Sequence, residues 1–237
     1  MIVAILQARM TSTRLPGKVL KDLCGRPMIA HQLDRIRLSK RLDRIIVATS
    51  DQPSDGSIEE FCQAENVSCY RGSLNNVLDR LYQASQMFGP PDHVVRLTAD
   101  CPLADWAIID SCVDLHLTSG ADYTSNAVVR TFPDGLDVEV IKTDALTTAN
   151  REAATTFDRE HVTPFIYNNP TIFRIEVLRQ DPNLELLRWT VDTPEDFEFV
   201  EHIYRAQIAA GYAFKQQDIL DFLNLAVHPV ISSSVVP

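Results

Sequence analysis

Several sequence features that define other protein classes are absent from this chain. No stretch approaches roughly 18 consecutive apolar residues, so no membrane span is expected. Residues 1–7 are apolar but too few for a signal peptide, and no basic segment precedes them. The 237 residues contain no internal repeat and no low-complexity linker. A chain of this length fits one large domain, or one domain with a small lobe.

Cysteine is sparse and widely spaced, with no CxxC pair. The five residues are Cys24, Cys62, Cys69, Cys101 and Cys112. An odd set at irregular intervals argues against a disulfide framework and against a zinc site. We therefore expect these side chains to pack rather than react, and we expect a reducing, cytoplasmic environment.

An excess of basic residues is also missing. The chain has 22 Lys and Arg against 32 Asp and Glu, a net charge of −10. A duplex-DNA binder of this size would carry a basic face, so nucleic acid is not the expected partner. An anionic substrate would need positive charge concentrated in one place. Because 45% of the residues are hydrophobic, a substantial core is expected.

Apolar runs alternate with amphipathic segments through the first half of the chain. Buried strands are predicted at residues 2–6, 45–49, 67–70 and 94–98. Four helices are predicted between and after these strands. One has Pro27 in its first turn, one opens with a capping box at residues 57–60, and two have apolar faces over 77–88 and 108–115. This alternation predicts βαβ units and an α/β fold with a mostly parallel sheet.

The pattern changes after about residue 122. Residues 136–140 alternate apolar and polar, which predicts a half-exposed antiparallel strand. Further strands are predicted at 172–177 and 186–191. Thr193 and Pro194 suit the start of a long helix that Gly211 would end. The tail, 227–237, has no periodicity, and we expect it to fray.

The segment after the first strand carries the strongest chemical signal. Residues 7–18 contain three cations, three hydroxyl side chains and no carboxylate: Arg9, Thr11, Ser12, Thr13, Arg14 and Lys18. Ligands of parallel sheets bind at the carboxyl ends of strands, where this loop would lie. Such a group of donors suits a triphosphate or a similar polyanion. The alternative is a solvated surface loop.

Two well-known phosphate motifs do not fit this loop. Gly17-Lys18 is followed by Val19 rather than Ser or Thr, and no glycine stands at position 12, so the loop is not G-x-x-x-x-G-K-[ST]. The G-x-G-x-x-G pattern is also absent. A P-loop NTPase and a dinucleotide-dependent oxidoreductase are therefore not expected.

Five stretches, in order from residue 2 to about residue 200, carry a resemblance to a known family. They are Gln7-Ala8-Arg9-Met10 with 14–20, 71–73 with 77–80, 96–103, 158–164 and 190–196. This set resembles the CMP-sugar synthetases, the cytidylyltransferases that activate 3-deoxy-octulosonic, sialic and related acids. Within them it is most similar to the SpsF-like branch of spore-coat polysaccharide biosynthesis. The loop lacks the G-x-G opening of hexose-1-phosphate nucleotidyltransferases, which favours a CTP enzyme acting on a sugar hydroxyl.

The resemblance implies a Rossmann-like nucleotidyltransferase fold, with a mixed, mostly parallel sheet flanked by helices. Residues 1–237 would form a single domain, with 122–185 as an inserted lobe for sugar binding and dimerisation. The implied enzyme is a homodimer that transfers CMP from CTP to an acidic (2-keto) sugar for surface polysaccharide. In the implied reaction, a sugar hydroxyl attacks the α-phosphate in line and displaces pyrophosphate, helped mainly by positioning and charge neutralisation.

The resemblance also implies roles for individual residues. Asp100 and Asp192 would each follow a strand and together hold one Mg²⁺, although Asp192 could instead be only a helix cap. Arg14 and Lys18 would complete the catalytic set. The implied nucleotide-binding residues are Gln7, Ala8, Arg9, Met10, Ser12, Arg14, Lys18, Asp79, Arg80 and Thr98.

The sugar is expected to bind in the middle of the chain. The implied contacts are Asn126, Asp137, Glu139, Arg159 and His161. Arg159 could grip a carboxylate with two parallel hydrogen bonds, and His161 could bind or help deprotonate a hydroxyl. The alternative is that Arg159 and His161 belong to a charged helix surface.

Three other functions stay open from the sequence. One is transfer from another nucleotide or to another alcohol. A second is a GT-A-like glycosyltransferase, although Asp100-Cys101-Pro102 lacks the D-x-D metal motif. A third is a scaffold domain without activity, against which the intact set Arg9, Arg14, Lys18, Asp100 and Asp192 argues.

Overall fold

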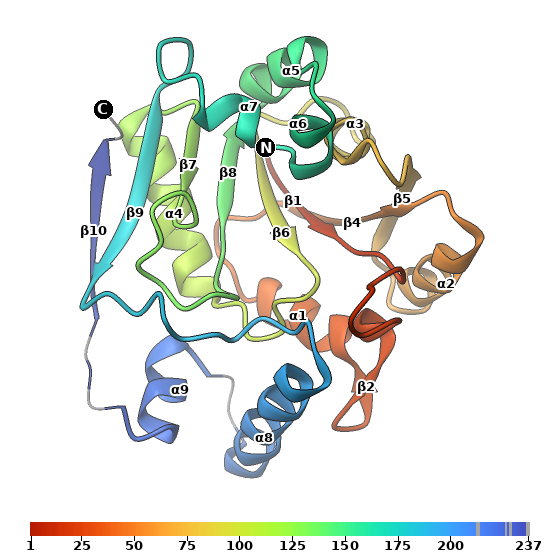
Figure 1. Ribbon diagram of the computed structural model, residues 1–237, viewed down its shortest axis with the longest axis vertical. Helices are drawn as coiled ribbons and strands as arrows, with labels where there is room; N and C mark the ends of the chain where they lie inside the picture. The colour runs from red at the N-terminus through yellow and green to blue at the C-terminus, as the bar shows by residue number, and fades with distance from the viewer. Residues whose placement is uncertain (212–213, 226, 228, 236–237) are drawn as a thin grey trace.

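An eight-stranded mixed sheet forms the centre of the molecule, in the order β10-β9-β7-β8-β6-β1-β4-β5. The computed structural model describes residues 1–211, 214–225, 227 and 229–235 (Figure 1). Four neighbouring strands run parallel: β1 (Ile2–Gln7), β4 (Arg44–Ser50), β5 (Ser68–Gly72) and β6 (His93–Thr98). All four predicted strands of the first half are present. The apolar runs of β1, β4 and β6 fit strands that are covered on both faces, whereas β5 is half-buried at the edge of the sheet.

The second half extends the same sheet with strands of both directions. These strands are β7 (Tyr123–Ser125), β8 (Glu139–Lys142), β9 (Ile175–Asp181) and β10 (Val230–Val235). β8 runs antiparallel to β6 and β7, whereas β7 and β9 are parallel. The predicted α/β fold with a mixed, mostly parallel sheet is confirmed. Residues 122–185 contribute three of its strands, and their separate role as a lobe stays a prediction.

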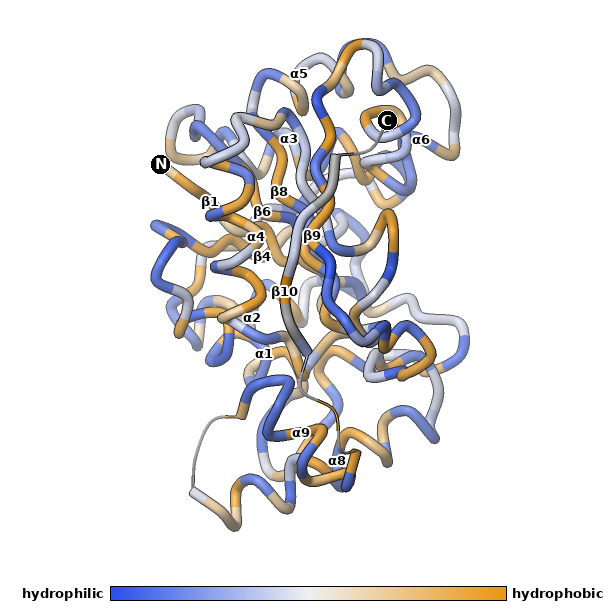
Figure 2. Tube along the Cα trace, turned by 90° about the vertical axis from the view of Figure 1, so that its left-hand side faces the viewer, coloured by the Kyte–Doolittle hydropathy of each residue, from blue (hydrophilic) through white to orange (hydrophobic). Residues whose placement is uncertain are grey.

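Helices cover both faces of the sheet. α1 (Met28–Ile36), α2 (Gly56–Ala64) and α4 (Trp106–Ser119) pack with α8 (Pro194–Ala210) and α9 (Gln216–Phe222) on one apolar core. α3 (Val77–Ser85), α5 (Thr143–Glu152) and α7 (Pro164–Tyr167) pack on the other core, beside the short α6 (Thr156–His161). β1 shows how the two cores form, because Ala4 and Leu6 enter the first and Val3 and Ile5 the second. In Figure 2 β1 is apolar along its length, whereas the outer helices change colour along the chain.

The start of α8 agrees with the sequence in detail. Thr193 is the N-cap and accepts a hydrogen bond from the backbone N–H of Asp196, while Pro194 occupies the first turn. The Asp196 carboxylate completes a capping box at the same end. Gly211 ends the helix with φ 75°, a left-handed conformation that favours glycine.

Several predicted elements are wrong at their ends or in kind. The capping box expected at residues 57–60 is absent, since α2 begins at Gly56 after a short 3₁₀ turn, Pro53–Asp55. α3 ends at Ser85, so Phe88 lies beyond the helix and is exposed. The strand expected at 136–140 is observed as β8, which begins only at Glu139. Residues 139–141 are buried rather than half-exposed, because helices cover both faces of the sheet. A small hairpin, β2 (Asp22–Leu23) with β3 (Arg26–Pro27), was not predicted.

Two predictions near the C-terminus are also wrong. Residues 186–191 form no strand; they include a turn and a bend, and a single bridge joins Arg188 to Asp134. Residues 230–235 do not fray, because β10 pairs antiparallel with β9 along its length. The predicted tail also included positions 228, 236 and 237, which lie outside the described residues.

The chain crosses from one side of β1 to the other between β5 and β6. β4 and β5 lie on one side of β1, and β6 lies on the opposite side. The loops that leave β1 and β6 therefore diverge at the carboxyl ends of these strands. Open α/β sheets bind ligands in the crevice at this crossover. No helix in the described part of the chain has the length and apolar character needed to cross a bilayer.

Candidate active site

A buried aspartate anchors the cation-rich loop that follows β1. Asp55 is fully buried, and its carboxylate accepts hydrogen bonds from the Met10 backbone N–H at 2.8 Å and from the Thr49 hydroxyl and Ser50 N–H at 3.1 Å each. The Met10 carbonyl in turn accepts from the Gly17 N–H at 2.9 Å. The loop is thus fixed by its own backbone before any ligand binds. Asp55 could not be identified from the sequence, because its partner Met10 is 45 residues away and no local pattern marks the contact.

Lys18 brings the two predicted metal-binding carboxylates together. Its side chain is only 9% exposed, and its Nζ donates to Asp192 Oδ1 at 2.9 Å and to Asp100 Oδ2 at 3.2 Å. Nζ also donates to the carbonyl of Val191 at 2.6 Å. The 3₁₀ turn Lys18–Leu20, which follows Gly17 with φ 71°, aims the side chain at this point. Two carboxylates that are distant in the sequence therefore share one ammonium group.

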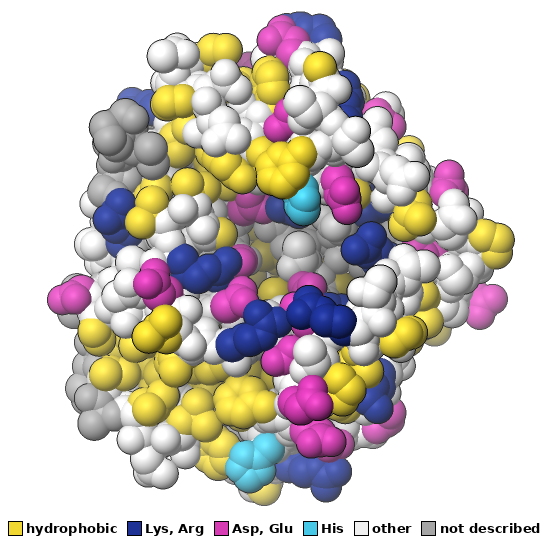
Figure 3. Space-filling view, in the orientation of Figure 1, with side chains coloured by type: hydrophobic (Ala, Val, Ile, Leu, Met, Phe, Trp, Pro, Cys, Tyr) yellow, Lys and Arg dark blue, Asp and Glu magenta, His cyan; other side chains and the backbone are white. Residues whose placement is uncertain are grey.

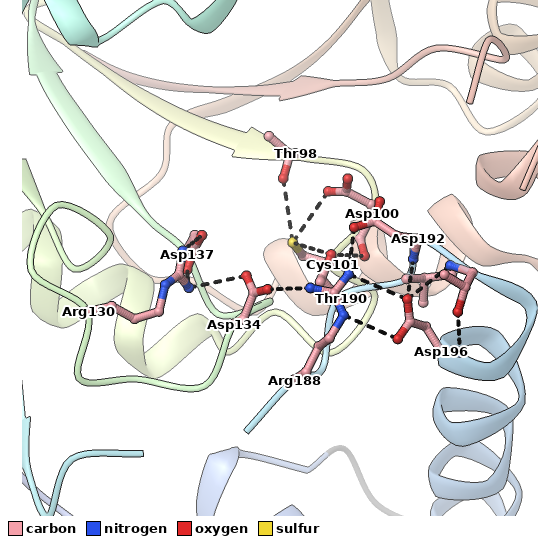
Figure 4. A network of polar contacts seen from close by, with 12 residues as sticks. Thr98, Asp100, Cys101, Arg130, Asp134, Asp137, Arg188, Thr190, Asp192 and Asp196 are labelled. Carbon is pink, nitrogen blue, oxygen red and sulfur yellow. Dashed lines mark hydrogen bonds and ion pairs between the residues drawn. The ribbon is translucent and has the colours of Figure 1, made fainter. Parts of the chain in front are cut away.

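Asp192 receives two further cations on its other oxygen. Oδ2 lies 2.9 Å from Arg14 Nη2 and 2.6 Å from Arg188 Nη2. Burial alone would raise the pKa of Asp192, but the hydrogen bonds from Lys18 and Arg188 and the charge of Arg14 hold it below its usual value. Asp192 reaches this position without the strand that the sequence predicted before it. Figure 4 shows it between Arg188 and Asp196.

These side chains line a cleft of about 200 Å³, which we name the loop cleft. Figure 3 shows Lys and Arg side chains gathered around a hollow in the centre of this face. Of the residues predicted to bind nucleotide or metal, most line it: Gln7, Ala8, Arg9, Ser12, Arg14, Lys18, Thr98, Asp100 and Asp192. The Arg14 side chain is 60% exposed and can reach a ligand. A group of forked donors and a buried ammonium in one cleft suits a polyphosphate.

Asp100 and Asp192 are the carboxylates that could hold a divalent cation here. Both reach the same point, the Lys18 ammonium, so they are close enough to share one ion. Among the described residues no three His, Cys, Asp or Glu side chains form a ready-made cluster. The donor set therefore fits Mg²⁺, which usually takes one or two carboxylates and completes its shell with water and substrate phosphates.

A second cavity of about 420 Å³ adjoins the loop cleft, and Thr98 lines both. We name it the second cavity. Its predicted members are Asp137, Glu139 and His161, and its wall also includes Arg96, Tyr123, Phe157, Thr163 and Tyr167. His161 packs against the ring of Phe157, with centroids 4.4 Å apart.

Glu139 is the polar centre of the second cavity. It accepts hydrogen bonds from the hydroxyls of Tyr123 and Thr163 at 2.6 Å each, and it forms an ion pair with Arg96. Burial raises the pKa of Tyr123 well above its usual value, so the phenol stays protonated and donates. Arg96 Nη2 also donates to Gln7 Oε1 at 3.2 Å, which links this cavity to the loop cleft. The charge of Glu139 is therefore already satisfied.

Asp137 is likewise paired. Arg130 donates to its two carboxylate oxygens at 2.6 and 2.8 Å. Burial nevertheless raises the pKa of Asp137, against the opposing effect of Arg130. Sequence reasoning missed both Arg130 and Arg188, because single arginines in irregular segments carry no local pattern.

Some predicted contacts line neither cavity. Arg159 Nη1 donates to Asn150 Oδ1 at 3.2 Å, and Asn150 Nδ2 donates to Asp79 Oδ1 at 3.4 Å. Asn126 is buried, with its amide bonded to the backbone of Leu136 and Val138. The predicted contacts Arg159 and Asp79 thus join α6 and α3 to α5 through Asn150, and Asn126 fixes the segment before β8.

Arg80 and Met10 are not among the residues that line the loop cleft. Met10 packs against the core. Arg80 is 1% exposed and donates from Nη1 to the Ser73 carbonyl at 2.7 Å, while its Nε and Nη2 find no hydrogen-bond partner among the described residues. Burial lowers the pKa of Arg80 to about 10. Its charge still contributes to the positive field behind the loop.

The cysteines form no disulfide. All five are free thiols, and three are buried. Cys101 lies beside the site, with Sγ 3.5 Å from Asp100 Oδ1, and burial raises the pKa of its thiol well above the usual value. A protonated thiol of this kind packs and donates weakly.

Comparison with known proteins gives a consistent result across most of the chain. The model of the family described as cytidylyltransferase matches residues 3–220. An uncharacterised protein of Methanocaldococcus jannaschii is 39% identical over 225 residues, which are 94% of this chain and 90% of that protein. The spore coat polysaccharide biosynthesis protein SpsF of Bacillus subtilis is 34% identical over 211 residues, 86% of each chain.

Two further proteins are similar over different lengths. A 3-deoxy-manno-octulosonate cytidylyltransferase of Anaeromyxobacter is 35% identical over 113 residues, 47% of this chain and 45% of its own. The solved structure of a cytidylyltransferase from Leptospira borgpetersenii superposes with a TM-score of 0.86 and 29% identity, covering 94% of this chain and 93% of that one.

Proposed function

This chain belongs to the cytidylyltransferase family, and from that premise we propose that it transfers CMP from CTP to a hydroxyl of an acidic (2-keto) sugar. The observation that carries the proposal is the loop cleft itself. Asp55 and Gly17 hold its backbone in place, and its three cations line the same cleft as two carboxylates at the sheet crossover. A preorganised site of this kind favours charge that develops during phosphoryl transfer.

In the proposed reaction, the sugar hydroxyl oxygen forms a bond to the α-phosphorus of CTP. The bond from that phosphorus to the oxygen bridging to the β-phosphate breaks, and pyrophosphate leaves with the bonding electrons. The hydroxyl proton passes to a base or to water. Arg9, Arg14 and Lys18 bind and neutralise the phosphates, and the fixed loop keeps the reacting atoms in line.

We propose that Mg²⁺ is the cofactor and that Asp100 and Asp192 would hold it. When bound, this ion supplies charge neutralisation for the phosphate oxygens. Lys18 and Arg14 currently contact the same carboxylates, so their transfer to the phosphates would free Asp100 and Asp192 for the ion.

The second cavity is proposed to take the sugar. It shares Thr98 with the loop cleft, so a ligand in one would lie next to a ligand in the other. His161 lines it and could accept the hydroxyl proton. Arg159 points to Asn150, so Arg96 is the arginine that lines the cavity for an acid. The acid itself is proposed from the relative named as a 3-deoxy-manno-octulosonate enzyme.

The cellular context is proposed on the same basis. The relative named for spore coat polysaccharide supports a role in surface polysaccharide. Free cysteines suit a reducing cytoplasm. A homodimer through residues 122–185 is supported by exposed apolar side chains such as Ile172, which is 58% exposed. Light scattering of the purified protein would give its mass in solution.

A pyrophosphate-release screen tests the function. CTP, UTP, GTP and ATP are each incubated with Mg²⁺ and a panel that contains 3-deoxy-manno-octulosonate, sialic acid and neutral sugars. We expect release only with CTP and an acidic sugar, and a CMP-sugar as the second product. Release with CTP and a neutral sugar, but not with CTP and an acidic sugar, would contradict the proposal of an acidic acceptor. No release with any pair of nucleotide and sugar would contradict the transferase assignment.

A further inference from the structure

A chain of ion pairs connects the two cavities through residues that no motif marks. Asp137 in the second cavity pairs with Arg130, and Arg130 Nη1 lies 3.2 Å from Asp134. Asp134 Oδ2 lies 2.8 Å from Arg188 Nη1, and Arg188 reaches Asp192 in the loop cleft. Figure 4 shows these side chains pointing toward one another from separate segments. The chain alternates in charge along its whole length.

Arg188 is the central member. It stands in the irregular segment between β9 and α8, and its guanidinium contacts three carboxylates. Nη2 lies 2.6 Å from Asp192 Oδ2, Nη1 lies 2.8 Å from Asp134 Oδ2, and Nε lies 3.3 Å from Asp196 Oδ1. Asp196 also accepts from the backbone N–H of Asp192 at 2.9 Å. A planar fork of donors can hold several carboxylates in fixed directions, which a lysine cannot.

The fold does not depend on this arginine. The same two segments are joined by backbone hydrogen bonds, from Trp189 N–H to the Asp134 carbonyl at 2.6 Å and from Asp134 N–H to the Leu187 carbonyl at 2.8 Å. Trp189 is buried, and Gly135 packs directly against its backbone, where a side chain would clash. The Arg188 and Asp134 side chains are 43% and 31% exposed. Ion pairs at such exposure add little to stability.

Asp192 contacts three cations, and of these only Arg188 lies outside the lining of the loop cleft. Its Oδ1 contacts Lys18, and its Oδ2 contacts Arg14 and Arg188. Lys18 and Arg14 line the loop cleft and would turn to the triphosphate, whereas Arg188 does not line it. Arg188 is therefore the cation that keeps Oδ2 occupied and leaves Oδ1 facing the cleft.

We propose that Arg188 is a positioning residue that orients Asp192. Through its ion pair with Asp134, Arg188 also couples the orientation of Asp192 to the segment that carries Arg130 and Asp137. The proposal rests on the proposed function, because it assigns Asp192 to the metal–nucleotide complex. Partners that orient metal ligands commonly change metal affinity or activity by roughly 10–100-fold when removed.

The test is a binding measurement that does not require turnover. Affinity for cytidine 5′-(α,β-methylene)triphosphate is measured by calorimetry, once with Mg²⁺ and once with EDTA. The proteins are the wild type, Arg188→Met, Arg188→Lys and the control Arg205→Met. Arg205 forms an exposed pair with Glu201 on α8, remote from both cavities. Thermal melts of all four show whether each variant folds.

We expect wild type and Arg205→Met to bind the analogue more tightly with Mg²⁺ than with EDTA. Arg188→Met should lose roughly tenfold or more of the Mg²⁺-dependent affinity, keep its EDTA affinity within about twofold, and melt near the wild type. Arg188→Lys should recover part of the loss, since one charge can still reach Asp192. Equal losses in both buffers, or no loss in either, would contradict the positioning role.

A second arm tests the connection to Asp134. Asp134→Asn keeps the backbone hydrogen bonds but removes one carboxylate from Arg188, so it should cause a smaller loss of the same Mg²⁺-dependent affinity. Combined with Arg188→Met it should add little, because both changes act on one chain of contacts. Fully additive losses would contradict the connection. A wild type that binds no analogue in either buffer would instead contradict the proposed function itself.

Discussion

Asp192 and Asp137 are the same residue type in neighbouring cavities, yet their pKa values move in opposite directions. In the loop cleft, Lys18, Arg188 and Arg14 outweigh burial and lower the pKa of Asp192. In the second cavity, burial outweighs two hydrogen bonds from Arg130 and raises the pKa of Asp137. Three cations and two carboxylates line the loop cleft, whereas each carboxylate of the second cavity is paired with one arginine. An excess of cations suits a triphosphate, and the hydroxyl and carboxylate groups in the wall of the second cavity suit the hydroxyls of a sugar acid.

The largest expected effect breaks the loop cleft. Lys18→Met removes the buried ammonium that contacts both carboxylates. Turnover with CTP should fall by roughly 10²–10³, the loss seen when one preorganised charge contact is removed from a transition state. Initial rates of pyrophosphate release at saturating sugar measure this. Rates within threefold of the wild type would exclude Lys18 from catalysis.

The next effect concerns the anchor of the loop. Asp55→Ala removes a buried carboxylate that accepts from Met10 N–H, Thr49 and Ser50. The free energy of unfolding should fall by at least about 1.5–3 kcal/mol, the contribution of a single hydrogen bond to a charged group. Urea titration measures it, with the exposed Asp51→Asn as control. An unchanged unfolding midpoint for Asp55→Ala would show that the loop does not rely on this anchor.

A third test asks how far Lys18 competes with a metal ion. In the absence of nucleotide, Lys18→Met should bind Mn²⁺ more tightly than the wild type, even though its turnover is lower. A unit charge about 4 Å away contributes ~4 kcal/mol at an effective dielectric of 20, so a gain of roughly tenfold is a modest expectation. Electron paramagnetic resonance of free Mn²⁺ measures it. Weaker binding by the variant would mean that Lys18 does not occupy the metal position.

The smallest effect is the pH dependence that distinguishes the two aspartates. A lowered folded-state pKa means that Asp192 stabilises the fold above its unfolded pKa of about 3.9, and this contribution is lost as the pH falls through the folded value. The melting-temperature advantage of wild type over Asp192→Asn should therefore shrink below about pH 4.

Asp137 should show the reverse. Its raised folded-state pKa means that protonation is favoured in the fold, so stability is lost as the pH rises from about 3.9 through the folded value. Relative to Asp137→Asn, the wild type should thus become less stable over that rise. Parallel pH profiles for the two pairs of proteins would remove the proposed contrast between the cavities.

The loop cleft could be predicted from the sequence better than the second cavity. The parallel strands and the cation-rich loop are local patterns, since periodicity and composition within a dozen residues define them. The meeting of Asp100 with Asp192 was expected from two strands, but one of those strands does not exist, and Lys18 and the capped start of α8 position Asp192 instead. The two carboxylates do meet at Lys18, and their sharing of a metal ion stays a prediction.

The second cavity could not be derived in the same way. Its polar groups pair across the sheet, as Arg96 does with Glu139 and Tyr123 with Glu139. Such contacts depend on register between strands that are distant in the chain. The motif at 158–164 predicts Arg159 as a sugar contact, whereas its side chain donates to Asn150. β10 was missed because its serine-rich sequence lacks periodicity, and only pairing with β9 makes it a strand.

The most direct test of the account compares the affinities of CTP and CMP for the ligand-free enzyme, measured by calorimetry with Mg²⁺ in wild type and Lys18→Met. The two nucleotides share the base, the ribose and one phosphate, so their difference reports the β- and γ-phosphates alone. We predict that the wild type binds CTP at least about tenfold more tightly than CMP, a difference of 1.4 kcal/mol, and that Lys18→Met loses most of this preference. Equal affinities in the wild type, or an unchanged preference in the variant, would contradict the assignment of the loop cleft as the triphosphate site.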